Sequence, residues 1–141
     1  EHDADRFRAF VNARIVGVPD ALSRRAVFAI NVPLVWGWNL AALWLAVLAG
    51  PGFGLFAVYL TLVNAAVHAL AWIALGRPNP GCYTGVTLFP LAGAFGLWAI
   101  HAAGGGAWPL HALAIAAAIA GHALIVVHIK RRSAALAAAA Q

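Results

Sequence analysis

The chain of 141 residues is 64% hydrophobic and only 9% charged, whereas a water-soluble domain has about 25% charged residues. This composition argues against a soluble globular protein and predicts one domain in a membrane. The net charge is +5, but the nine basic residues flank or separate the apolar segments, which argues against a nucleic-acid partner.

Residues 1–25 form a polar segment that holds all four acidic residues and five of the nine basic ones. Its apolar residues recur at helical spacing with charged residues between them: Ala4, Phe7, Phe10, Val11 and Ile15. This pattern predicts a short amphipathic helix in the membrane interface. Pro19 and Asp20 then indicate a turn, and Asp20 is a candidate cap for the helix that follows.

Four apolar segments follow, and we expect them at residues 26–50, 53–76, 80–103 and 108–129. Each is long enough, at a rise of about 1.5 Å per residue, to cross a hydrocarbon core of about 30 Å. Pro33 predicts a kink in the first segment, because proline removes a backbone hydrogen bond. Asn79 and Pro80 are typical of a cap and a first helical residue, so they predict the start of the third segment.

The sequence therefore predicts an all-α fold, a polytopic transmembrane helix bundle at residues 26–132 with an Ala-rich tail at 133–141. The N-terminal segment, the loop at Arg77 and the run from Lys130 to Arg132 are basic, whereas the two glycine-containing turns are uncharged. Four crossings place all three basic regions on one side of the membrane. The excess of basic residues in cytoplasmic loops makes that side the cytoplasmic one.

Histidines inside the bilayer are the candidate functional residues, because an ionisable group in lipid is costly without a partner. His68 lies nine residues before the basic Arg77 loop. His122 lies eight residues before the basic end, so both are roughly 12 to 14 Å inside the cytoplasmic boundary. Two imidazoles at one depth could share a ligand, although a lone His68 is also consistent with a histidine bonded to a neighbouring helix. Asn64 precedes His68 by four residues and shares its helix face.

A metal ion needs more than two imidazoles, and the four expected spans contain no Asp or Glu. If iron or zinc binds, a carboxylate has to come from the beginning of the chain or from sequence that is not shown. The remaining histidines have no assigned role: they lie at the start of the chain, near the outer boundary or near the basic end, and they are His2, His101, His111 and His128.

Several of these residues occur in an order that resembles the HxxEE-motif family of small bacterial membrane proteins. The resemblance extends over residues 1–132 and rests on Asn64-x-x-x-His68, on Asn79-Pro80-Gly81-x-x-Thr84-Gly85-Val86-Thr87 and on Pro90. Members have a first helix that ends in His-x-x-Glu-Glu and a late His-x-x-x-His pattern. The late pattern is not matched here, because His122 and His128 are six residues apart.

The resemblance implies a further transmembrane helix before Glu1, with Glu1 as the last residue of the name-giving motif. It also implies a metal ion, iron or zinc, held between helices near the cytoplasmic face of a bacterial inner membrane. Glu1, His68 and His122 would be ligands, and Asn64 would orient the site. The expected function is that of a metal-dependent membrane enzyme that acts on a lipid-like or hydrophobic substrate.

Two other functions remain open from the sequence. One is a non-catalytic subunit that packs in a larger membrane complex or a homo-oligomer, favoured by the Ala/Gly-rich fourth segment and the tryptophans. The other is a b-type haem protein with His68 and His122 as axial ligands. Membrane lipid is the expected surrounding partner in each case.

Overall fold

The computed structural model describes residues 2–139, with side chains from residue 5, and within that part of the chain every regular element is a helix. The expectation of an all-α helical bundle is therefore confirmed. The elements are α1 (His2–Phe10), η1 (Val11–Val16), α2 (Arg24–Ala29), η2 (Ile30–Trp36), α3 (Gly37–Ala49), η3 (Pro51–Gly54), α4 (Leu55–Leu75), α5 (Cys82–Ala102) and α6 (Trp108–Ala139).

Four helical stretches are long and apolar enough to cross a membrane, and they are Arg24–Ala49, Pro51–Leu75, Cys82–Ala102 and Trp108–Ala139. In their most apolar windows only 6% to 17% of the residues are buried inside the molecule. The apolar side chains therefore face outward, where only hydrocarbon can solvate them favourably. The chain is an integral membrane protein.

The first span is interrupted where the sequence places its proline. Pro33 lies in η2, a stretch in which the helix widens from the α to the π hydrogen-bonding pattern, whereas the kink expected at this residue stays a prediction. Pro90 does not interrupt α5, which runs without a break from Cys82 to Ala102. Beyond the basic residues, α6 continues to Ala139, so the Ala-rich tail extends the fourth span as a helix.

Two caps predicted from the sequence are wrong. The start of α2 is capped by Ser23, whose side chain accepts a hydrogen bond from the Ala26 N–H, and not by Asp20. Asp20 instead adopts a φ of 57°, within the turn before α2. Asn79 does not cap α5 with its side chain, because the helix begins at Cys82 after Gly81, and the Asn79 side chain contacts another helix.

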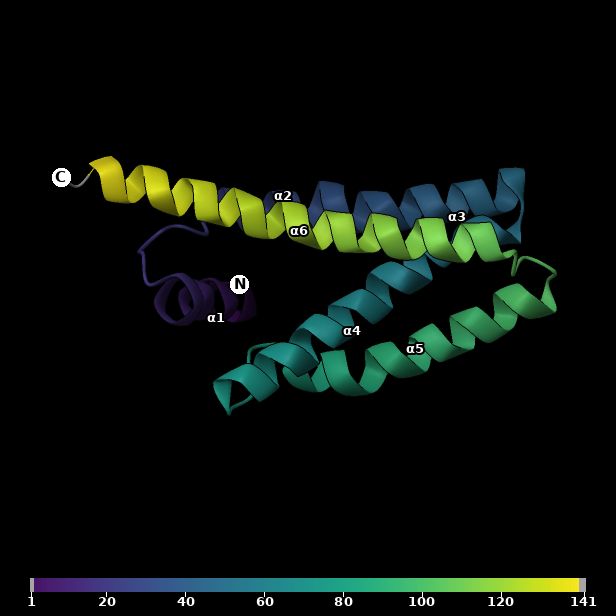
Figure 1. Ribbon diagram of the computed structural model, residues 1–141, viewed down its shortest axis with the longest axis horizontal. Helices are drawn as coiled ribbons and strands as arrows, with labels where there is room; N and C mark the ends of the chain where they lie inside the picture. Colours follow the sequence, from purple (N-terminus) through teal and green to yellow (C-terminus); the bar gives the residue numbers. More distant parts are fainter. Residues whose placement is uncertain (1, 140–141) are drawn as a thin grey trace.

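The helix α4 is the centre of the bundle, since it packs against α3, α5 and α6. It runs alongside α6 near the turns before α4 and α6, and the two helices diverge toward their other ends (Figure 1). The chain reverses between successive spans, so α1, the α4–α5 turn and the end of α6 all lie toward one end of the molecule (Figure 1). The three basic regions are therefore at the same end.

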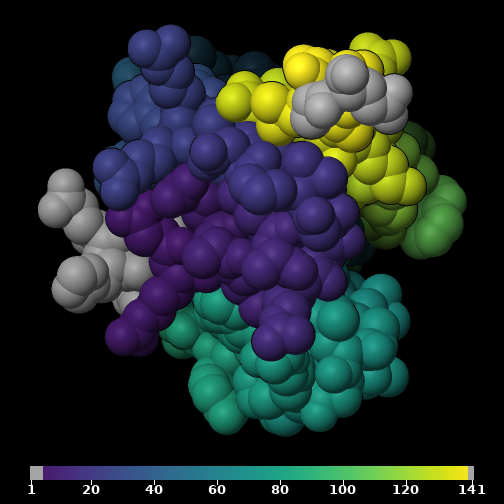
Figure 2. All heavy atoms as spheres, turned by 90° about the vertical axis from the view of Figure 1, so that its left-hand side faces the viewer, coloured from purple at the N-terminus to yellow at the C-terminus, as the bar shows by residue number. Residues whose placement is uncertain are grey.

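The N-terminal segment fills the space at this basic end. Figure 2 shows it between the α4–α5 turn, in teal, and the end of α6, in yellow. The buried Asn12 side chain bonds both backbone groups of Leu22, with its Nδ2 3.1 Å from the carbonyl oxygen and its Oδ1 2.7 Å from the N–H. Arg132 of α6 donates to the carbonyl of Asp20 at 2.9 Å. The segment is thus held to its own end at Leu22 and attached to the last span by Arg132.

Ion pairs connect α1 to the start of α2. Arg24 donates to both carboxylate oxygens of Asp5, at 3.2 and 3.0 Å, and Arg8 donates to Asp20 at 2.9 Å. The hydrogen bonds from Arg24 hold the pKa of Asp5 below its ordinary value of 3.8. The stabilisation from this depressed pKa is therefore present above the ordinary value and is lost as the pH falls below it.

We predict that Asn12→Ala loosens the N-terminal segment. The substitution leaves the N–H and the carbonyl of the fully buried Leu22 without partners, and each such group costs about 1–3 kcal/mol. Trypsin should then cleave after the exposed Arg14 several-fold faster in detergent-solubilised protein. Asn31→Ala is the matched control, because Asn31 is exposed and bonds only its own helix. Equal cleavage of both variants would contradict this role of Asn12.

Candidate functional site

The imidazole of His68 occupies a defined position at the basic end of the bundle, between α4 and the start of α5. Its Nδ1 lies 2.6 Å from Oδ1 of Asn79, and Nδ2 of Asn79 donates to the backbone carbonyl of His68 at 3.0 Å. Asn79 is buried, with an exposed fraction of 7%, and the His68 ring is half-buried. One side chain thus bonds both the imidazole and the backbone of the same residue.

This pairing determines the tautomer of His68. Because Nδ2 of Asn79 donates to a carbonyl, the atom that faces the imidazole is Oδ1, which can only accept a hydrogen bond. The proton of the neutral imidazole is therefore on Nδ1, and Nε2 retains a lone pair. A lone pair at Nε2, with Nδ1–H donated to an oxygen, is the arrangement of histidines that bind metals or accept protons.

Two glycines make room for the His68 ring. A Cβ added at Gly85 would lie 2.9 Å from Cδ2 and Cγ of His68, and one at Gly81 would lie 3.2 Å from Cε1. Gly81 also has a φ of 81°, a left-handed conformation that glycine adopts without strain. Asn79, Gly81 and Gly85 together form what we call the imidazole seat. The three residues thus share one role, which is to accommodate and bond the His68 side chain.

His122, the second expected metal ligand, lies on α6 and bonds its own helix. Its Nδ1 is 2.9 Å from the carbonyl oxygen of Ala118, so Nδ1 carries the proton and Nε2 again keeps a lone pair. No described hydrogen bond or ring contact joins His122 to His68, whose ring lies against α5. Glu1, the third expected ligand, lies outside the described residues.

The described side chains do not by themselves complete a metal site. Among residues 5–139, no three histidine, cysteine or carboxylate side chains are grouped so that they could hold one ion. Two half-buried imidazoles with Nε2 lone pairs are present, but zinc and iron sites need three or more ligands. Metal binding by Glu1, His68 and His122 therefore stays a prediction.

Asn64 shares the helix face of His68 but has no hydrogen-bond partner among the described residues. Its side chain makes no hydrogen bond to the described part of the chain, and its amide atoms are not sealed from the molecular surface. Thr84 and Thr87, which lie at a similar level, are exposed, and the Thr87 hydroxyl donates to the backbone carbonyl of Tyr83. Asn64 is therefore the polar group beside His68 that remains available for a ligand.

A second cluster of aromatic and titratable residues lies at the opposite end of the bundle. The Tyr59 hydroxyl is 2.7 Å from Nδ1 of His111, which is buried, and the rings of His101 and His111 are 5.1 Å apart. Trp108 stacks over the His111 ring at 6.4 Å. The sequence placed both histidines near the outer boundary but did not predict their contact. Their positions on either side of the Gly104–Gly106 turn are the signal that could have indicated it.

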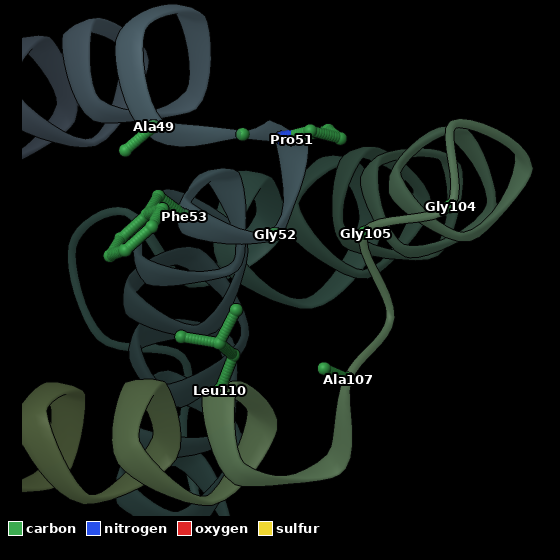
Figure 3. A pocket seen from close by; sticks show the side chains of 9 residues that line it. Ala49, Pro51, Gly52, Phe53, Gly104, Gly105, Ala107 and Leu110 are labelled. Atoms are coloured by element: carbon green, nitrogen blue, oxygen red, sulfur yellow. The ribbon is translucent and has the colours of Figure 1, made fainter.

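A surface recess of about 190 Å³ lies beside this cluster, between the turn from α3 to α4 and the turn from α5 to α6 (Figure 3). Gly52 and Gly105 pack closely there, since a Cβ on Gly52 would lie 2.6 Å from the Gly105 carbonyl oxygen. No titratable side chain lines the recess, whose lining residues are Ala49, Gly50, Pro51, Gly52, Phe53, Gly104, Gly105, Ala107 and Leu110. It has the character of a packing defect between turns and offers no group for chemistry.

Comparison with known proteins gives no match to any family model, to any curated protein or to any solved structure. The resemblance to the HxxEE-motif family is therefore supported only by the residues that carry it. Functional conclusions have to come from the geometry around His68 and from the polar residues near it.

We predict that Gly85→Ala destabilises the protein by about 1–3 kcal/mol, because the new methyl group overpacks the His68 ring. Thermal unfolding in detergent, followed by circular dichroism, measures the effect. Gly37→Ala is the control: no atom lies within 4 Å of its added Cβ, and alanine favours a helix by up to about 1 kcal/mol. In a His68→Ala background the Gly85→Ala penalty should largely vanish. A penalty that persists there would show that the glycine does not serve the imidazole.

We predict that Tyr59→Phe destabilises the protein by about 1–3 kcal/mol, because it leaves Nδ1 of the buried His111 without its partner. Tyr83→Phe is the matched control, since Tyr83 is exposed and only its ring is in contact, with Trp72. The same unfolding experiment compares the two variants. Similar unfolding temperatures would mean that the Tyr59 hydroxyl contributes nothing to the packing of α4 against α6.

Proposed function

We propose that the chain is a metal-dependent integral membrane enzyme that acts on a lipid-like or hydrophobic substrate near the cytoplasmic face. The observation that carries the proposal is the seated imidazole of His68. Its Nδ1–H is donated to a buried asparagine, so its Nε2 lone pair is free to bind a metal ion or to accept a proton. A histidine with a purely structural role needs a hydrogen bond at only one nitrogen and does not need a fixed ring. Here the two glycines of the seat also hold the whole ring in one position.

The division of roles follows from the hydrogen bonds. His68 would bind the metal or move a proton at Nε2, and Asn79 is a positioning residue that fixes the tautomer. Iron or zinc would supply activation of oxygen or water. His122 supplies a second Nε2 lone pair, and the carboxylate would be that of Glu1. The described side chains do not complete a metal shell, so the proposal requires further ligands from residues outside the described part.

The proposed orientation rests on charge. The N-terminal segment, the Arg77 turn and the end of α6 lie at the same end of the molecule, and they carry all nine basic residues. Basic residues accumulate on the cytoplasmic side of membrane proteins, so we place this end in the cytoplasm of a bacterium with the spans in its inner membrane. His68 then lies close to the cytoplasmic face, and the Tyr59–His111 cluster lies close to the opposite face.

A second function, that of a non-catalytic subunit, is favoured by the outer surface of the spans. Large aromatic side chains are exposed on α3, α5 and the start of α6, with exposed fractions of 63% for Trp44, 66% for Trp98 and 77% for Trp108. Such surfaces suit lipid, but they also suit the helices of a larger complex or a second copy of the chain. Unlike the enzyme, a subunit of this kind needs no metal and no free Nε2.

We predict that the full-length protein, purified in detergent, contains about one iron or zinc ion per chain, and that His68→Ala and His122→Ala each lose most of it. Elemental analysis of the purified variants measures the content. His128→Ala is the control, because His128 is exposed near the basic end. Stoichiometric metal that survives both substitutions would remove these ligands from the proposal. A Soret band in the absorption spectrum would instead identify haem as the group that the histidines hold.

A further inference from the structure

The side of α4 between α3 and α5 is a partly open groove. Both α3 and α5 pack against α4 rather than against each other. Between them lies a recess of about 140 Å³, lined by Asn39 of α3, by Ala57, Val58 and Thr61 of α4, and by Ala92 and Gly93 of α5. Because α4 is the floor of this recess, its polar residues determine what can bind there.

Polar residues continue along α4 from the recess to the imidazole seat. Thr61, Asn64 and His68 are separated by three and four residues, so they lie on one face of the helix. The stripe spans about 10 Å at a rise of about 1.5 Å per residue. We call Thr61, Asn64 and His68 the polar stripe. It leads from the middle of the span to the proposed reactive atom, Nε2 of His68.

Asn64 stands out among the asparagines of the chain. Asn31 and Asn39 each donate to the carbonyl four residues earlier, while Asn12 and Asn79 bond neighbouring segments. Asn64 alone has no hydrogen bond to the described residues. Inside hydrocarbon an unpaired amide costs free energy, because no water replaces the missing partner. A polar group from outside the described residues is therefore expected at Asn64.

The hydrogen-bonding groups of the groove define the chemistry of that group. Thr61 donates its proton to the carbonyl of Ala57, so its oxygen can only accept further hydrogen bonds. Asn39 keeps its Oδ1 and one N–H, because it donates only once, to Val35. Asn64 does not line the recess itself, but it lies one turn beyond Thr61 on the same face of α4 and offers both a donor and an acceptor. The groove therefore fits a group that both donates and accepts, such as a hydroxyl or an amide.

The lack of charged residues further restricts the chemical class of the group that can bind in the groove. Residues 26–76 and 78–129 contain no Asp, Glu, Lys or Arg, so no side chain that lines the recess can neutralise an ionic head group. A charge placed there would be desolvated without a counter-ion, which is far more costly than a hydrogen-bonded neutral group. A transmembrane helix is also a poor fit, since its diameter with side chains is about 10–12 Å, whereas the recess is small.

We infer that the recess and the polar stripe bind the uncharged polar group of a single-chain amphiphile, such as a long-chain alcohol or amide, whose tail leaves the groove into the surrounding lipid. This group would be hydrogen-bonded by Asn64 and guided toward His68. The inference names the substrate class of the proposed enzyme and rests on that function for turnover. Binding of the amphiphile itself requires only the groove.

Photo-crosslinking tests the inference on the full-length protein in phosphatidylcholine nanodiscs. The probes are a long-chain alcohol with a diazirine next to its hydroxyl, and the carboxylate and trimethylammonium compounds of equal chain length. We expect the alcohol to label residues around Asn39, Thr61 and Ala92, at least about tenfold more than either charged probe, because a charge at this depth is costly. Equal labelling by a charged probe would overturn the inference.

Matched variants test whether the alcohol probe binds at the polar stripe. Asn64→Leu and Thr61→Val should each lower the labelling by about twofold to tenfold, the range expected for one lost hydrogen bond. Asn31→Leu and Thr87→Val should leave it unchanged, since both residues are exposed and bond only their own helices. Unchanged labelling in the first pair would overturn the role of the stripe. Crosslinking of two chains through cysteines placed at position 64, in a Cys82→Ala background, would show a second copy in the groove and would also overturn it.

The metal content of the same preparations separates this inference from the proposed function. A protein without metal that still prefers the alcohol probe refutes the metal-dependent enzyme and leaves the binding groove in place. A protein with stoichiometric metal that labels equally with all three probes refutes the groove and leaves the enzyme in place.

Discussion

The absence of water inside the bilayer is the constraint on which the structure depends. Polar side chains within the spans need partners from the protein, and most obtain them locally. Asn31, Asn39, Thr61, Thr87, His101 and His122 all bond the carbonyl four residues earlier in their own helix. This local bonding satisfies the donor without help from another helix, and it leaves packing to determine how the helices meet.

Only a few polar contacts cross between helices, and together they hold α4. The indole of Trp38 on α3 donates to the carbonyl of Phe56, and Tyr59 bonds His111 of α6. His68 bonds Asn79 at the start of α5. Each neighbour of α4 is thus attached to it by one or two described hydrogen bonds, at a different level along the helix. Small residues complete the packing: Gly93 and Gly96 of α5 receive Leu62 and Val58 of α4 at close range.

Hydropathy determines the spans, so their number and approximate limits follow from the sequence alone. The N-terminal helix and the disturbance at Pro33 are equally local features. The caps at Asp20 and Asn79 were wrong because a capping residue is recognised by its neighbours in sequence. The Asn79 side chain is bonded to a histidine eleven residues away, and Ser23 is better placed at the start of α2.

The contact between His101 and His111 depends on how two helices fold back at a glycine turn. The imidazole seat could be predicted only in part. Its glycines are visible in the sequence, but their contact with the His68 ring depends on how α4 and α5 pack.

The sites around His111 and His68 differ in burial and in the hydrogen bonding of their polar groups. These are the properties that distinguish a structural histidine from a functional one. His111 is buried, covered by Trp108, and bonded to a tyrosine of the neighbouring helix, so its polar atom is committed to holding α6 on α4. His68 is bonded just as firmly at Nδ1, but its ring is half-buried and its helix face carries an amide without a partner. A fold whose stability alone mattered would have an apolar residue at position 64, because leucine needs no partner in lipid. The amide that lacks a partner among the described residues, next to a positioned imidazole, is thus the feature that supports the proposed ligand at this face of α4.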